Sequence, residues 1–203
     1  VVRMRVISGR FKGVALTTPK SGTRPTTDRT KEAIFSHLDS WGVLDDARVL
    51  DLFAGTGALG IEALSRGARE LVAVESSAPA AALIAQTLTA LKHNRSWEHG
   101  MSARVVKARA EKYASSASAV EPFDMVFIAP PYAFETNDCN QLLADLASRE
   151  LTSSNTVIML ERSTRSEAPA APANWEITDR RDYGETAVYY IEPSEPISDK
   201  GQH

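Results

Sequence analysis

The stretch VLDLFAGTGALG, residues 49–60, decides the fold that the sequence predicts. An apolar run of strand character ends at Asp51 and gives way to a loop of small residues. Apolar residues at helical spacing follow at Ile61, Leu64 and Ala68. A strand, a tight turn and a helix in this order form the first half of a βαβ nucleotide-binding unit.

The glycines and acids of this stretch indicate the class of cofactor. Gly55 and Gly57 allow tight backbone angles, and without side chains they leave room for a ligand. Together with Gly60 they fit the dinucleotide fingerprint, with Glu75 at the distance of a ribose-binding acid. Asp51, however, would repel a diphosphate and attract the ammonium and sulfonium groups of S-adenosylmethionine. We therefore predict S-adenosylmethionine rather than a nicotinamide cofactor, with a turn that binds no ligand as the third interpretation.

Length and composition indicate an ordinary soluble chain. The 203 residues are 43% hydrophobic and 24% charged, which fits one α/β domain with a small appendage. Apolar runs stay well below the roughly 18 residues that span a bilayer, and the first residues lack the apolar core of a signal peptide. Cys139, the single cysteine, suits a reducing compartment and a buried position. We expect a cytoplasmic monomer with no membrane contact and no metal.

Charge is distributed unevenly along the chain. The net charge is −3, but residues 1–31 hold eight basic residues and one acidic residue, and so carry +7. Residues 32–203 hold 15 basic and 25 acidic residues. A basic arm on an acidic body favours a polyanionic partner such as RNA. A solvated basic face with no partner is the alternative.

The order of patterns along the chain predicts three regions. A basic β-hairpin arm, residues 1–25, has strands at 5–9 and 13–17 and ends in an irregular linker at 19–25. Residues 26–192 form the main domain, which starts with a helix capped within 26–28. Residues 193–203 are polar and predicted to be disordered.

Strands and helices alternate through the main domain. After the first strand, further strands are predicted at 70–75, 104–107, 123–128, 156–161, 175–178 and 186–191, and helices at 78–91 and 140–148. This alternation is typical of a mostly parallel sheet covered on both faces. The last two strands have no full helix between them, so we expect an antiparallel strand at one edge of a seven-stranded sheet.

A second chemical stretch, residues 129–134 with the sequence APPYAF, follows the strand at 123–128. Parallel sheets bind ligands at the carboxyl ends of their strands, so this loop should face the glycine loop. Pro130 and Pro131 stiffen the backbone, which can aim a carbonyl at an exocyclic amine while Tyr132 stacks on a base. The alternative is a strand-ending turn whose tyrosine packs into the core.

Together these stretches resemble class I S-adenosylmethionine-dependent methyltransferases of the amino-methylating branch, whose signature is Asp/Asn-Pro-Pro-Tyr/Phe. Residues 5–13, 24–35, 51–68 and 183–186 resemble the bacterial 16S ribosomal RNA guanine-N2 methyltransferase family. The resemblance extends over residues 5–192 and implies a Rossmann-like class I fold. It also implies methyl transfer to the exocyclic N2 of a guanine in 16S rRNA of the small ribosomal subunit or its assembly intermediate.

The resemblance assigns roles to individual residues. The implied cofactor-binding residues are Asp51, Phe53, Ala54, Gly55, Gly57, Glu75, Ser76, Arg109 and Ala110. The implied catalytic loop is Ala129, Pro130, Pro131 and Tyr132, which contacts a flipped base. The implied RNA-binding residues are Arg10, Lys12, Arg24, Thr26 and Arg29.

Two positions depart from the family's pattern. Ala129 stands where the signature has an acid that accepts hydrogen bonds from the target amine. Arg109 stands where an acid would read the adenine amine, and a guanidinium has only donors. The alternative function is therefore an RNA-binding assembly factor that keeps the methyltransferase fold but has impaired chemistry.

Overall fold

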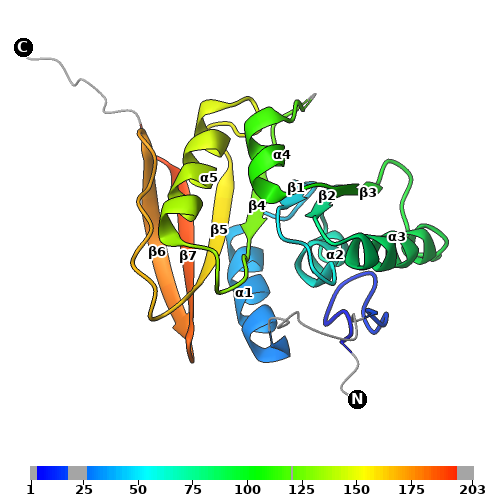
Figure 1. Ribbon diagram of the computed structural model, residues 1–203. Helices are drawn as coiled ribbons and strands as arrows, with labels where there is room; N and C mark the ends of the chain where they lie inside the picture. Colours follow the sequence, from blue (N-terminus) through cyan, green and yellow to red (C-terminus); the bar gives the residue numbers. More distant parts are fainter. Residues whose placement is uncertain (1–3, 18–26, 120, 196–203) are drawn as a thin grey trace, which may run out of the picture.

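The computed structural model describes residues 4–17, 27–119 and 121–195, and its seven strands within those ranges form one sheet between two layers of helices (Figure 1). The strand order is β3-β2-β1-β4-β5-β7-β6. The strands are β1 (Arg48–Asp51), β2 (Glu70–Glu75), β3 (Ser102–Lys107), β4 (Met125–Ile128), β5 (Val157–Ser163), β6 (Trp175–Tyr183) and β7 (Thr186–Pro193).

The sheet is parallel from β3 to β5, which confirms the predicted Rossmann-like class. β7 runs antiparallel to both β5 and β6. The reversed strand therefore lies one place in from the edge, and β6 is the edge strand. The central strands β1 and β4 are buried at every position, as expected for parallel strands covered on both faces.

The helices cover both faces of the sheet. α1 (Asp28–Trp41), α2 (Ala58–Ser65) and α3 (Ala78–Lys92) pack on one face, and α4 (Ala110–Ser116) and α5 (Thr136–Ser148) pack on the other (Figure 1). The sequence did not predict α4, because seven residues rich in Ala and Ser show little periodicity. α5 begins before the predicted residue 140, in a polar first turn. None of the described helices has the length and apolar character needed to cross a membrane.

The N-terminal segment, residues 4–17, packs into the main domain. The predicted hairpin forms as a loop with one antiparallel bridge between Arg5 and Ala15, rather than as two strands. Met4, Val6 and Phe11 belong to the same buried core as α1 and α2. Residues 4–17 of the predicted arm therefore belong to the body of the molecule. The predicted linker and most of the predicted tail lie outside the described residues.

A buried ion pair joins this segment to α1 and α2. Lys31 and Glu62 have fully buried side chains, with 3.6 Å between Nζ and Oε1. The backbone N–H groups of Ile7 and Ser8 donate to the Glu62 carboxylate at 2.8 and 3.4 Å. The segment also lies so close to α2 that a Cβ on Gly9, whose φ is +89°, would be 2.0 Å from the Ser65 carbonyl oxygen. Only glycine fits there.

Candidate active site

A cleft of about 810 Å³ opens at the carboxyl ends of the parallel strands. This is the edge at which open α/β sheets bind ligands. Four loops line it, each following one of the strands β1 to β4, together with the end of β5 and the start of α1. The lining residues are Thr27, Thr30, Leu52, Phe53, Gly55, Val74, Glu75, Ser76, Ala108, Arg109, Ala110, Glu111, Ala129, Pro130, Pro131, Tyr132, Phe134, Glu161, Arg162, Ser163 and Thr186.

The glycine loop and Glu75 form one wall of the cleft. Gly55 has a left-handed φ of 58°, and its N–H donates to Glu75 Oε1 at 2.9 Å. The Ser77 N–H donates to Glu75 Oε2 at 3.0 Å. Each carboxylate oxygen can accept more than one hydrogen bond, so both can also receive ribose hydroxyls. These residues therefore fit the ribose of S-adenosylmethionine.

Gly57 and Gly60 lie close to apolar side chains of the protein. Gly57 has a φ of 81° and lies outside the residues that line the cleft. A Cβ on Gly57 would lie 3.1 Å from the Ile61 side chain, and one on Gly60 would lie 2.5 Å from the Leu71 side chain. The space beside Gly57 is thus bounded by the Ile61 and Ile84 side chains, and contact between Gly57 and the cofactor stays a prediction.

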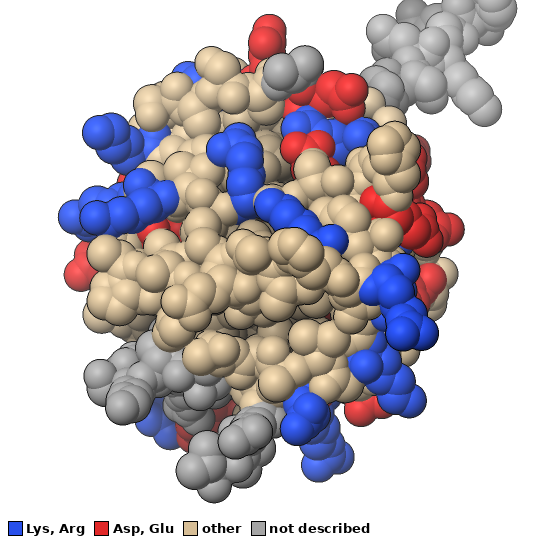
Figure 2. Space-filling model, turned by 90° about the vertical axis from the view of Figure 1, so that its right-hand side faces the viewer, with Lys and Arg blue, Asp and Glu red and all other residues tan. Residues whose placement is uncertain are grey.

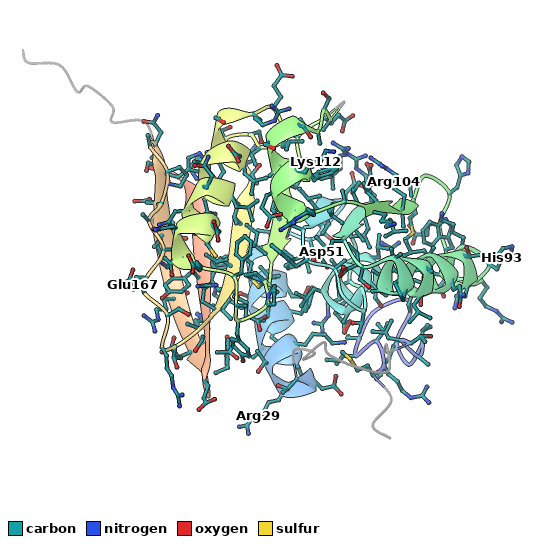
Figure 3. All side chains as sticks on the ribbon, in the orientation of Figure 1. Arg29, Asp51, His93, Arg104, Lys112 and Glu167 are labelled. Carbon is teal, nitrogen blue, oxygen red and sulfur yellow. The ribbon has the colours of Figure 1, made fainter. Side chains whose placement is uncertain are left out.

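Asp51 lies behind the glycine loop rather than at its lip. Asp51 is 1% exposed, and Figure 3 shows it in the middle of the molecule, whereas Arg29, His93 and Glu167 lie toward the margins. The backbone N–H groups of Phe53 and Gly60 donate to the carboxylate, whose Oδ1 has no hydrogen-bond partner among the described residues. Burial raises the pKa of Asp51 to about 7, and the nearby Glu75 carboxylate adds to this. Any electrostatic effect of Asp51 on a bound cation would therefore act across the glycine loop.

The loop at residues 129–134 forms the opposite wall. The Phe134 N–H donates to the Pro131 carbonyl at 3.0 Å, and the Phe134 ring meets Phe53 edge-on at 5.2 Å between centroids. This contact joins the loop to the glycine loop. Tyr132 is 57% exposed at the cleft, so its ring is not packed into the core. Ala129 and Pro130 are half-buried beside it.

Arg162 holds this loop in place, a role that sequence reasoning missed. Its side chain is buried at the end of β5, with Nη1 donating to the Phe134 carbonyl at 2.7 Å and Nη2 to Thr136 Oγ1 at 3.3 Å. Thr30, Glu161, Ser163 and Thr186 also line the cleft without a predicted role, and Thr27 was predicted only as part of a helix cap. A signal was present for Glu161, because β5 carries an acid near its carboxyl end as β1 and β2 do.

The cleft wall after β3 carries Arg109 and Ala110. The Arg109 side chain is 79% exposed and pairs with Glu111 at 3.5 Å. Ala110 is buried where α4 begins. Phe53 and Ser76 also line the cleft, whereas Ala54 is buried outside the lining. The structure thus brings most of the predicted cofactor residues to one cavity.

The predicted RNA-binding residues differ in how far they are engaged within the protein. Arg10 donates from Nε to the Leu64 carbonyl at 2.8 Å and from Nη2 to the Ala68 carbonyl at 2.9 Å, so its guanidinium caps the end of α2. Its Nη1 pairs with Glu98 at 3.2 Å. The Arg10 guanidinium, which the resemblance implied to bind RNA, is thus engaged within the protein. Arg24 and Thr26 lie outside the described residues.

Lys12 and Arg29 are exposed, and Figure 3 shows Arg29 pointing outward from the first turn of α1. Figure 2 shows Lys and Arg side chains around the rim of one face and also across its upper middle, above a band that carries neither sign of charge. Groups of three or more His, Cys, Asp or Glu side chains able to hold a metal ion do not occur among the described residues.

Comparison with known proteins agrees with this geometry. The family described as conserved hypothetical protein 95 matches residues 4–192. The ribosomal RNA small subunit methyltransferase D of Escherichia coli K12 is 32% identical over 186 residues, covering 91% of this chain and 87% of that protein. The solved structure of Escherichia coli yhhF superposes with a TM-score of 0.79 at 31% identity, covering 95% and 98% of the two chains.

A more distant structure bears on the fold alone. The magnesium protoporphyrin IX methyltransferase of Synechocystis, solved with bound S-adenosylmethionine, superposes with a TM-score of 0.61 at 14% identity. It covers 85% of this chain and 87% of its own.

Proposed function

Because the chain belongs to the conserved hypothetical protein 95 family, with the bacterial small-subunit ribosomal RNA methyltransferases D among its relatives, we propose that it methylates the exocyclic N2 of a guanine in 16S rRNA. The chain is a class I methyltransferase that uses S-adenosylmethionine. One observation carries the proposal. A single cleft combines the Gly55–Glu75 cradle with the Pro-Pro-Tyr loop on its facing wall.

The residues of the chain divide the work between cofactor and base. Glu75 would hold the ribose hydroxyls, and Gly55 with Ser76 would border the rest of the cofactor. The bound cofactor supplies a methyl group on a positively charged sulfur. Pro130 and Tyr132 would orient a flipped guanine, the first through its carbonyl and the second by stacking. The stiff Pro-Pro backbone keeps that orientation without loss of entropy at the moment of transfer.

The RNA partner is supported by the relatives' names and by charge. A small-subunit RNA, alone or in an assembly intermediate, offers phosphates to the exposed Lys12 and Arg29. The target base must leave its stack to enter the cleft, and a single-stranded or weakly paired guanine does so at least cost.

A radiolabelled methyl-transfer assay on purified small subunits tests the proposal. We expect wild-type protein to label 16S rRNA, and mass spectrometry of the digested RNA to identify N2-methylguanosine. Glu75→Ala, run beside it, should lose both transfer and binding of S-adenosylhomocysteine. Label on another nucleoside, or on protein, would overturn the proposed substrate.

The second candidate is an RNA-binding assembly factor with little or no chemistry. It is favoured by Ala129 and Arg109, which stand where the family's pattern has acids. Such a protein would bind small-subunit RNA with the same affinity with and without S-adenosylhomocysteine. Methyl transfer by wild-type protein in the assay above would exclude it.

A further inference from the structure

The proposed reaction needs a hydrogen-bond acceptor beside the target amine. An exocyclic amine donates two hydrogen bonds, and once its nitrogen has gained a methyl group it must lose a proton. The Pro-Pro-Tyr loop begins at Ala129, whose methyl group can neither accept a hydrogen bond nor take a proton. The Pro130 carbonyl can accept one of the two hydrogen bonds but is too weak a base to take the proton. The group that accepts the second hydrogen bond and the proton must therefore come from another element that lines the cleft.

Three carboxylates line the cleft among the described residues: Glu75, Glu111 and Glu161. Glu75 receives the N–H groups of the glycine loop and belongs to the cofactor wall. Glu111 lies in the first turn of α4, where it pairs with Arg109 at 3.5 Å. Glu161, near the end of β5, is the one on the same wall as the Pro-Pro-Tyr loop.

The strand register puts Glu161 next to Ala129. β4 and β5 are parallel neighbours whose pairing ends with Ile128 aligned to Leu160, and the next residue of each segment, Ala129 and Glu161, lines the cleft. Aligned residues of adjacent strands lie about 4.8 Å apart and point to the same side of the sheet. Glu161 therefore reaches the space that the methyl group of Ala129 leaves open.

The alternation along both strands identifies that side. Phe127 and Met159 point into the core shared with α1 and α2, whereas Ile128 and Leu160 point into the core beneath α4 and α5. One residue further, Ala129 and Glu161 turn back toward α1, whose Thr27 and Thr30 line the cleft. The half-buried Glu161 carboxylate is thus enclosed between α1 and the Pro-Pro-Tyr loop, where a base held by Tyr132 would present its edge.

Building on the proposed function, we propose that Glu161 is a catalytic residue that accepts a hydrogen bond from the target amine and then its proton. The lone pair of N2 forms the bond to the methyl carbon while the carbon–sulfur bond breaks and its electron pair stays on sulfur. N2 is then positively charged, and one of its protons passes to the Glu161 carboxylate. Glu161 returns that proton to water at the open side of the cleft.

Substitutions at Glu161 separate proton transfer from hydrogen bonding. Glu161→Gln keeps the size and one acceptor oxygen, and we expect single-turnover methyl transfer to fall about 10²-fold or more. The methyl-transfer rate of Glu161→Ala should be lower still. Glu176→Gln, an exposed glutamate on the edge strand β6, is the matched control and should transfer at the wild-type rate.

Restoring the acid from the neighbouring strand gives the sharpest test. Adding Ala129→Asp to Glu161→Ala should raise the methyl-transfer rate at least tenfold above that of Glu161→Ala alone, because the two side chains at these positions face the same space. Calorimetry with S-adenosylhomocysteine and filter binding of small-subunit RNA should give affinities within about twofold of wild type for every variant. A loss of either affinity in Glu161→Gln would make Glu161 a structural residue and overturn the inference.

The failure of this inference differs from failure of the proposed function. If wild-type protein methylates guanine N2 and Glu161→Gln does so at an equal rate, Glu161 is not the acceptor. If wild-type protein binds no S-adenosylhomocysteine and transfers no methyl group, both the proposed function and the inference on Glu161 fail.

Discussion

Removing the charge of Glu62 tests how the N-terminal segment is held to the methyltransferase body. In Glu62→Gln the amide keeps one acceptor oxygen but has no charge to balance the buried Lys31 ammonium, which lies 3.6 Å from Oε1. The variant also places an NH₂ group near the backbone N–H of Ile7 or Ser8, both of which donate to the carboxylate. One substitution thus disturbs α1, α2 and residues 5–8 together.

The expected loss follows from these contacts. Removing one partner of a buried ion pair costs about 3–5 kcal/mol, because the other charge stays buried without compensation. For a chain of this length that corresponds to a fall in melting temperature of about 6–20 °C. Lys31→Met should cost less, since Glu62 would keep the N–H donors of Ile7 and Ser8 and the guanidinium of Arg66, whose Nε lies 3.5 Å from Oε2.

Urea unfolding followed by circular dichroism measures both changes. Glu98→Gln is the control, because Glu98 is 72% exposed where it pairs with Arg10, and such pairs contribute about 0–1 kcal/mol. An unfolding free energy for Glu62→Gln within 1 kcal/mol of wild type would refute the reasoning. A larger loss of unfolding free energy in Lys31→Met than in Glu62→Gln would also refute it.

Three further outcomes are expected. Folding raises the pKa of Asp51 from 3.8 to about 7, so protonation of Asp51 favours the folded chain. The unfolding free energy of wild type, relative to that of Asp51→Asn, should therefore fall by at most about 4 kcal/mol between pH 4 and 7 and stay constant above pH 7. Urea unfolding measured across this pH range would show no such fall if the carboxylate were solvated. Glu75→Gln should weaken S-adenosylhomocysteine binding at least tenfold in calorimetry, because the amide can accept ribose hydroxyls at only one position, and unchanged affinity would place the ribose elsewhere. Replacing both Lys12 and Arg29 by Ser should lower the slope of log affinity against log salt for RNA by about 1.5, while the control Arg95→Ser leaves it as it was; equal slopes would move the RNA to another surface.

The sequence predicts the sheet well because its strands are buried on both faces. Continuous apolar runs such as β4 leave few other assignments, and Gly55 with Glu75 marks the cofactor end of the sheet. The antiparallel pairing of the last two strands was also predicted, because no full helix separates their two patterns. Local chemistry was sufficient at these places.

Most of the differences at the site come from three-dimensional contacts that a local pattern does not show. Arg10 was predicted to be free because its partners, the Leu64 and Ala68 carbonyls, lie more than fifty residues away. Asp51 was expected to act directly on a cationic cofactor, because a sequence does not show that Phe53 and Gly60 fold over its carboxylate. Glu161 gained its meaning only when the register aligned it with the loop after β4.

The reversed strand β7 has a consequence for synthesis of the chain. β6 reaches the sheet only through β7, which lies between it and β5, so β6 has no place to dock until the strand after it has left the ribosomal tunnel. The nascent chain must carry a long unpaired strand for that interval, and the charged residues along β6, Asp179 to Asp182, keep that strand from pairing with other chains. A chain terminated before Thr186 would lose both strands at once and expose the apolar flank of β5.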